Sequence, residues 1–129
     1  MAANTVFTPS PIFEPQFIPT VPAALTFKPN AGGVAVPANF TYQINTCNVT
    51  NISGVPVSLT VWRVPAGSAN DNQHIRIPST VVVPAATGSI PWVELTILEG
   101  VNLMAGDAIW ASAEAANALV IDADGTVIQ

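Results

Sequence analysis

The residues of this chain best suited to nucleophilic or acid–base chemistry are its only histidine, His74, and its only cysteine, Cys47. A Ser-His-Asp triad would have to use His74, and a Cys-His pair would need both residues. Neither lies in a supporting motif such as the G-x-S-x-G nucleophile turn. We therefore predict no catalytic residues, a surface or hydrogen-bonded His74, and a buried Cys47. The single cysteine excludes an intrachain disulfide, which is typical of a reducing compartment.

Carboxylates offer two further chemistries, metal binding and glycoside hydrolysis. The segment 122–125, Asp-Ala-Asp-Gly, resembles the start of a calcium loop, but the ligands that should follow are missing. Scattered carboxylates could pair as acid and base in a glycosidase, although a solvated surface role is commoner for them. These carboxylates are Glu94, Glu99, Asp107 and Glu114. We predict no metal, no cofactor and no enzymatic activity, with a small carbohydrate-active enzyme as the least favoured alternative.

Three N-x-S/T sequons begin at Asn39, Asn48 and Asn51. Such sequons are acceptors for N-linked glycans in secreted proteins. The first residues of the chain, however, lack the positive and apolar regions of a secretory signal peptide. We therefore expect the sequons to be incidental and the chain to be made in a cytoplasm.

The three tryptophans are better suited to contacts than to chemistry. Trp62, Trp92 and Trp110 each fall out of phase with the apolar alternation around them, opposite the expected core side of their strands. Tryptophan is characteristic of protein interfaces. We therefore predict that these residues form a surface for the N-terminal segment or for another subunit. The alternative is that their strands are buried on both faces or shifted by a bulge, with Pro91 as a phase breaker.

Short strands are expected to position these side chains. Period-two alternation of apolar and polar residues, the signal of a half-buried strand, is clearest in residues 40–45, 55–61 and 93–97. Shorter candidates are residues 75–77, 81–83, 108–113 and 119–121. Asp124-Gly125 predicts a tight hairpin that folds residues 119–122 back against 126–128. About eight short strands without a convincing helix predict an all-β fold, an antiparallel β-sandwich or jelly roll.

The N-terminal segment, residues 1–23, differs from the β-domain expected at 24–129. Its many prolines rule out helix and favour an extended backbone. Ordering such a backbone costs about 1–2 kcal/mol per residue, and each buried apolar side chain returns about 1.5–3 kcal/mol, so nearly every apolar side chain must be buried. We predict an arm that is ordered when docked on a neighbouring subunit, and a β-domain that stays folded without residues 1–22. The docking residues are Phe7, Ile12, Phe13, Phe17 and Ile18.

Composition narrows the class of partner. Hydrophobic residues make up 50% of the chain and charged residues 9%, well below the roughly 25% of an ordinary soluble domain. We infer that partners cover part of the surface. The net charge of −5, with only Lys28, Arg63 and Arg76 as cations, predicts no nucleic-acid binding and no attachment to a membrane.

Several segments, in this order, carry a resemblance that covers roughly residues 34–129. They are NVTNISG at 48–54, VPVSLTVWRVPAG at 55–67, HIRIP at 74–78, and the stretch 95–121. Together they resemble a family of small bacteriophage virion proteins with a β-sandwich fold. The resemblance implies a capsid decoration or cement protein or a tail-associated component, and the long arm favours the head.

From these features we expect a non-enzymatic structural protein that stabilises a phage head through its β-domain and its arm. The expected partners are the major capsid protein and copies of the chain itself, in a dimer or trimer on the capsid surface. The alternative is a tail or tail-fibre-associated binding module that recognises host polysaccharide.

Overall fold

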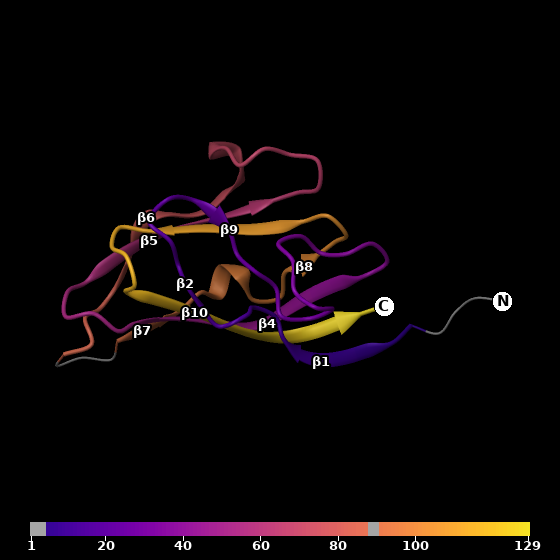
Figure 1. Ribbon diagram of the computed structural model, residues 1–129, viewed down its shortest axis with the longest axis horizontal. Helices are drawn as coiled ribbons and strands as arrows, with labels where there is room; N and C mark the ends of the chain where they lie inside the picture. Colours follow the sequence, from indigo (N-terminus) through magenta and orange to yellow (C-terminus); the bar gives the residue numbers. More distant parts are fainter. Residues whose placement is uncertain (1–4, 88–90) are drawn as a thin grey trace.

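Two antiparallel sheets face each other in the computed structural model, which describes residues 5–87 and 91–129 (Figure 1). The first sheet has six strands, in the order β1-β10-β4-β7, with β2 beside β10 and β8 beside β4. The second has four, in the order β3-β9-β5-β6. The predicted all-β fold class, an antiparallel β-sandwich, is confirmed.

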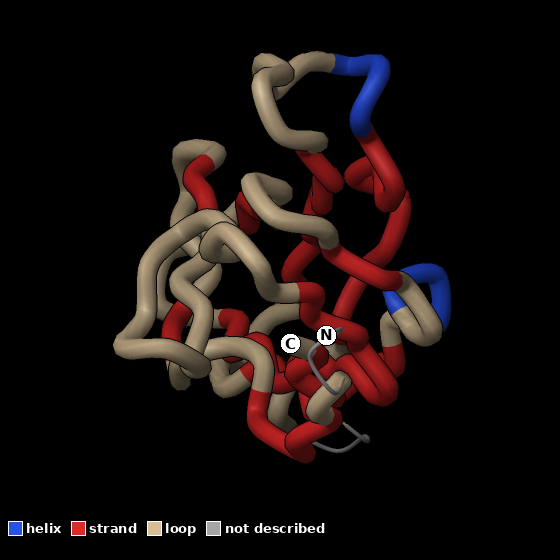
Figure 2. The backbone as a smooth tube through the Cα atoms, turned by 90° about the vertical axis from the view of Figure 1, so that its right-hand side faces the viewer, coloured by secondary structure: helices blue, strands red, loops and turns tan. Residues whose placement is uncertain are grey.

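The strands range from long central ones to two-residue segments at the edges. The first sheet contains β1 (Phe7–Pro11), β2 (Gln16–Phe17), β4 (Thr41–Asn51), β7 (Trp92–Glu94), β8 (Asn102–Leu103) and β10 (Leu119–Ile128). The second contains β3 (Ala23–Ala24), β5 (Val57–Val64), β6 (Ile75–Val83) and β9 (Ala108–Ala113). Two short 3₁₀ helices, η1 (Asn72–His74) and η2 (Thr96–Leu98), lie outside the sheets (Figure 2). Within residues 5–87 and 91–129, no helix is long and apolar enough to span a membrane.

The core lies between the two sheets and follows the alternation seen in the sequence. In β10 every odd-numbered residue from Leu119 to Val127 is buried, and every even-numbered residue is at least partly exposed. Aromatic rings fill one side of the core, where Phe27 stacks on Phe13 at 5.7 Å and meets Tyr42 edge-on at 5.3 Å. Large side chains buried in this way each stabilise the fold by about 1.5–3 kcal/mol.

The hairpin predicted at Asp124-Gly125 is wrong, because β10 runs through both residues without turning. The pairing of β10 with β4 shifts there, so that Asn45 is an extra residue on β4, which is a β-bulge. A Cβ atom on Gly125 would overlap the backbone carbonyl oxygen of Gln43. Glycine is therefore required at this position for close approach of two strands rather than for a turn.

The strand predicted at residues 93–97 ends early. β7 stops at Glu94, and the Leu95 amide donates to the Cys47 carbonyl at 2.8 Å before the chain coils into η2. This turn places Leu98 in the core and leaves Ile97 50% exposed. The alternation predicts a strand longer than the one that forms, because the 3₁₀ turn puts Leu98 instead of Ile97 on the core side after Leu95.

The N-terminal segment packs on its own chain. Its strands β1 and β2 pair with β10, and β3 pairs with β9, so the segment crosses from the first sheet to the second and covers one side of the sandwich. Ile12 and Ile18 donate backbone hydrogen bonds to the β10 carbonyls of Ala123 and Leu119, both at 2.8 Å. The expectation of an arm ordered only on a neighbouring subunit is therefore wrong for residues 7–23, because β10 and β9 offer strand partners within the chain.

Prolines occupy selected positions of β1. Val6 and Gln129 exchange two backbone hydrogen bonds at 2.9 Å, and the Ile12 amide donates to the Ala123 carbonyl. Hydrogen-bonded pairs alternate with non-bonded pairs along an antiparallel ladder. The nitrogens of Pro9 and Pro11 consequently point away from β10, where no ladder hydrogen bond is lost.

Candidate interaction surface

The outer face of the first sheet is centred on the even-numbered residues of β10. Because the odd-numbered residues are buried, Val120, Asp122, Asp124, Thr126 and Ile128 point away from the core. Strands β1, β2, β4 and β7 extend this face on either side. We call it the β10 face.

An apolar row crosses the β10 face at one end. Val120 pairs with Phe17 on β2 and with Thr50 on β4, and Thr50 pairs in turn with Trp92 on β7. Directly opposite residues in antiparallel strands have Cβ atoms about 4.5–5.5 Å apart, so the side chains touch along the row. Phe17 is 43% exposed and Trp92 is 49% exposed. Two residues predicted separately as partner contacts therefore belong to one row, which we call the Phe17–Trp92 row.

Two shallow hollows adjoin this row and share Pro15 and Val120 as walls. One, of about 410 Å³, extends toward Ile52, which is itself 55% exposed. The other, of about 260 Å³, lies beside Gln16 and Phe17. The row of side chains and the two hollows beside it give an uneven apolar surface that can receive apolar side chains of a partner.

A second apolar group lies at the opposite end of the β10 face. Phe7 is 64% exposed and pairs with Ile128, which pairs with Thr41. The exposed Met104 lies next to Thr41, with its sulfur 3.8 Å from the hydroxyl oxygen. At roughly 3.3 Å per residue along β10, this group is about 26 Å from the Phe17–Trp92 row.

Carboxylates occupy the middle of the face. Asp122 and Asp124 are exposed on β10, and Asp122 shares a cross-strand row with Asn48 and the exposed Glu94. A hydrogen bond with Glu99, reinforced by the negative charge of that residue, raises the pKa of Glu94. None of the described strand residues of this face is a lysine or arginine.

The other arm residues named from the sequence lie in the core. Ile12 and Ile18 are 0% exposed and Phe13 is 3% exposed. Phe13 forms an isolated β-bridge with Phe27, and the Lys28 amide donates to the Ile12 carbonyl at 2.8 Å. These three side chains stabilise the sandwich from within, and only Phe7 and Phe17 of the five remain at the surface.

The other two tryptophans lie on the opposite side of the molecule. Trp62 pairs with Trp110 on the outer face of the second sheet, because their neighbours Val61 and Ala111 form a pair in the core. Trp62 is only 8% exposed and also pairs with Ile75, which directly follows η1. Other segments of the same chain therefore cover the outer side of Trp62. This agrees with the alternative prediction, a strand that is buried on both faces.

The residues considered for chemistry are dispersed. Burial, together with the charges of Glu99 and Asp122, raises the pKa of Cys47 to about 12, so the thiol stays protonated and unreactive at neutral pH. His74 Nδ1 lies 3.0 Å from the Asp71 carboxylate and 3.0 Å from the Ala69 carbonyl oxygen. Across residues 5–87 and 91–129, no group of three or more metal-ligating side chains comes together.

In one of the three sequons the fold buries the acceptor asparagine. Asn51 is fully buried, and its amide nitrogen donates to the carbonyls of Val55 at 2.8 Å and Val83 at 3.1 Å. Its side-chain oxygen accepts from the amide and hydroxyl of Ser53, at 2.8 and 2.7 Å. This asparagine ties the end of β4 to the segment that precedes β5 and to the end of β6, and its nitrogen is not accessible to glycosylation in the folded chain.

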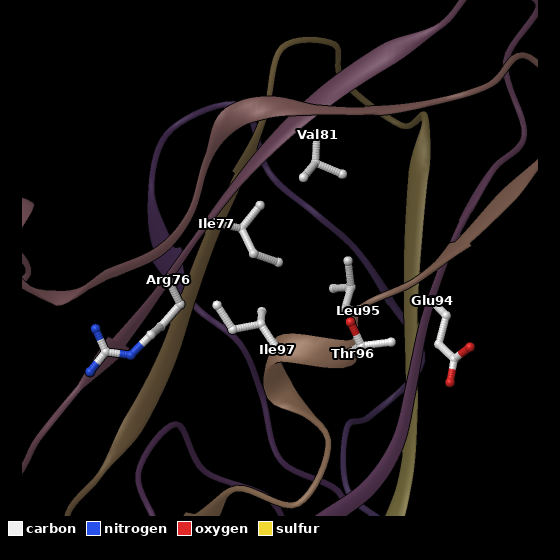
Figure 3. A pocket seen from close by; sticks show the side chains of 7 residues that line it. All are labelled: Arg76, Ile77, Val81, Glu94, Leu95, Thr96 and Ile97. Atoms are coloured by element: carbon white, nitrogen blue, oxygen red, sulfur yellow. The ribbon is translucent and has the colours of Figure 1, made fainter.

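A small apolar pocket of about 230 Å³ opens where the two sheets separate between β6 and η2 (Figure 3). Ile77 and Val81 line it from β6, and Leu95 and Ile97 line it from the η2 region, while the charged ends of Arg76 and Glu94 point outward (Figure 3). It lies at the edge of the second sheet opposite to the arm strand β3.

Sequence reasoning missed the residues that connect the exposed aromatics. Val120 and Ile52 were not singled out, and nothing local in the sequence indicates that β2 pairs with β10. The outward alternation Val120, Asp122, Asp124 was the signal that could have found the centre of this face. Comparison with protein-family models, with characterised proteins and with solved structures finds no match for this chain.

Proposed function

We propose that this chain is a non-enzymatic structural protein of a bacteriophage virion, a capsid cement or decoration protein that docks on the head through its β10 face. The observation that carries the proposal is the Phe17–Trp92 row, in which two half-exposed aromatic side chains stand at the ends of one cross-strand row that runs through Val120 and Thr50. Exposed aromatic residues next to small hollows are characteristic of protein interfaces. The resemblance of residues 34–129 to small virion β-sandwich proteins supports the assignment to a phage.

The fold suits such a role because the face is preformed. The arm strands that carry Phe7 and Phe17 are held by β10, so these side chains are positioned before a partner arrives. Preorganisation lowers the entropy lost on binding. The proposed partners are the major capsid protein and further copies of the chain, in a dimer or trimer on the capsid surface.

Electron microscopy of purified particles tests the location. A cement protein is expected in many symmetric copies on the head, and a position confined to the tail would refute this assignment. Add-back of the purified protein to heads that lack it tests the surface. Trp92→Ala and Phe17→Ala should each weaken binding at least about tenfold, as expected for interface hot spots.

Val82→Ala is the matched control for the add-back. Val82 is 50% exposed but lies in β6, on the second sheet, so its loss should leave binding unchanged. Equal effects of all three substitutions would contradict docking through the β10 face.

A tail-fibre-associated module that binds host polysaccharide is the second candidate. The half-exposed Trp92 beside Thr50 and near Glu94 favours it, because an aromatic ring stacked on a sugar with nearby polar groups is one way to bind a glycan. Tail density in the micrographs, together with saturable binding of host polysaccharide that Trp92→Ala abolishes, would select this candidate.

A further inference from the structure

We propose that the partner bound at the β10 face presents lysine or arginine side chains between two apolar contacts. The inference rests on the proposed docking function and names the chemistry of the partner. It starts from the order of side chains along β10, which is Val120, Asp122, Asp124, Thr126 and Ile128.

The carboxylates form a single patch. Asp122 and Asp124 project from the same strand about 6.6 Å apart, and Glu94 is two strands from Asp122, which is about 10 Å. All three are exposed, and each apolar group lies beyond one end of the patch. A partner that covers both the Phe17–Trp92 row and the Phe7 end must therefore also cover the carboxylates.

Covering these carboxylates removes water from them, which is unfavourable unless a cation replaces it. Within residues 5–87 and 91–129, no lysine or arginine side chain supplies that cation to the face. Lys28 lies 3.3 Å from Glu14, and Arg63 lies 3.8 Å from Asp107. Arg76 lies on the β6 side of the pocket that it shares with Glu94, and its charged end points away from Glu94 (Figure 3). The compensating charge has to come from the partner.

A second copy of the chain is a poor occupant for the same reason. Two β10 faces brought together would place the carboxylates of one copy against those of the other, and like charges across an interface cost several kcal/mol. The carboxylates also repel anionic partners such as nucleic acid or acidic lipid, because these partners carry the same negative charge. A basic protein surface meets the apolar ends and the acidic middle at once.

The test measures the add-back of the full-length protein to heads that lack it, as a function of salt. Raising NaCl from about 0.1 M to about 1 M shortens the Debye length from about 10 Å to about 3 Å. The wild-type affinity should therefore fall clearly over this range. The double variant Asp122→Asn/Asp124→Asn should bind about tenfold more weakly at the lower salt and show a flatter salt dependence.

The control is a double variant with the same change in net charge elsewhere. Asp71→Asn/Glu114→Gln neutralises two exposed carboxylates that lie outside the β10 face, and it should bind like the wild type. Thermal unfolding verifies that both double variants are folded, which the exposure of all four residues favours.

The outcomes separate the inference from the proposed function. Wild-type binding that is insensitive to salt, or equal binding of the Asp122/Asp124 variant, overturns the basic partner while leaving docking in place. Failure of the wild type to bind heads at any salt overturns the docking function, and the inference falls with it. Salt-insensitive binding to a neutral host polysaccharide instead would identify the tail-fibre alternative.

Discussion

Trp62 and Trp92 both lie on outward-facing positions of their strands, yet their surroundings differ. Trp62 is covered by Trp110, Ile75 and the segment around η1, whereas Trp92 lies at the end of a three-residue edge strand with no element beyond it in the described sheet. Two tryptophans that are both out of phase with the apolar alternation therefore end in different surroundings, one covered and one exposed. At the scale of single residues, phase indicates which side of a strand a side chain takes, and only tertiary packing decides whether that side is covered.

This difference predicts losses of stability of different size when the two tryptophans are replaced. Trp62→Ala should lower the free energy of unfolding by about 3 kcal/mol, because a buried tryptophan leaves a large cavity. Trp92→Ala should lower it by less than about 1 kcal/mol, as for other exposed positions. Urea titration followed by circular dichroism measures both. Similar losses for the two variants would mean that Trp92 is also covered.

Cys47 gives the chain a predictable alkaline sensitivity. Its thiol is fully buried with a pKa of about 12, against an ordinary value near 9 in the unfolded chain. Below about pH 9 the Cys47 thiol is protonated in both the folded and the unfolded chain, so its titration does not lower the stability. Between about pH 9 and 12 only the unfolded state loses the proton, so stability should fall by up to about 1.4 kcal/mol per pH unit.

The control for this pH dependence is Cys47→Ala. The substitution opens a cavity and lowers stability at neutral pH, but the difference between wild type and variant should shrink as the pH rises above about 9. Chemical denaturation at several pH values measures this difference. A gap that stays constant up to pH 11 would contradict the elevated pKa.

At the scale of strands and helices, the long central elements were predictable and their partners were not. Alternation located β9, most of β5 and the first part of β10, because a strand buried on one face imposes period two on its sequence. The pairing of β2 with β10 joins segments at opposite ends of the chain, and no local pattern encodes it. The Phe17–Trp92 row depends on that pairing, so the site was found only in part from the sequence.

The dipeptide Asp124-Gly125 is compatible with two different structures, a hairpin turn and a close approach of two strands. Asp-Gly favours a tight hairpin turn, but here the glycine gives the bulge of β4 room against β10. Gly125→Ala should lower the free energy of unfolding by about 2–3 kcal/mol, since the added carbon overlaps the Gln43 carbonyl and approaches Ile12 Cγ1 to 2.9 Å.

Gly54→Ala is the matched control in the same unfolding assay. A Cβ atom there meets nothing within 4 Å, so the change should stay within about 0.5 kcal/mol. Equal stability of the two alanine variants would show that the strands can separate at Gly125 without cost, contrary to the close packing described.

At the scale of the whole molecule, the arm and the β-domain form one folding unit. Residues 1–22 include Ile12, Phe13 and Ile18, whose loss at about 2–5 kcal/mol each would exceed the stability of many small domains. A chain lacking residues 1–22 should therefore be unfolded or aggregated, which reverses the expectation drawn from the sequence. Size-exclusion chromatography and thermal unfolding test this directly.

A shorter deletion separates the two roles of the arm. Removing residues 1–11 takes away β1 and the exposed Phe7, and none of the described residues 5–11 is buried. The remaining chain should therefore unfold cooperatively at a somewhat lower temperature. Cooperative unfolding of the chain that lacks residues 1–22 would show instead that the core closes without the arm.

The two prolines of β1 have a consequence for how folded copies of the chain can associate with one another. An uncapped edge of a large sheet is a template on which further chains add strand by strand, and such growth ends in fibres. Pro9 and Pro11 offer no amide hydrogen on that side of β1, so fibre growth from this edge of the larger sheet is blocked at its first step. The segment that carries the exposed Phe7 thus also protects the folded chain from cross-β self-association.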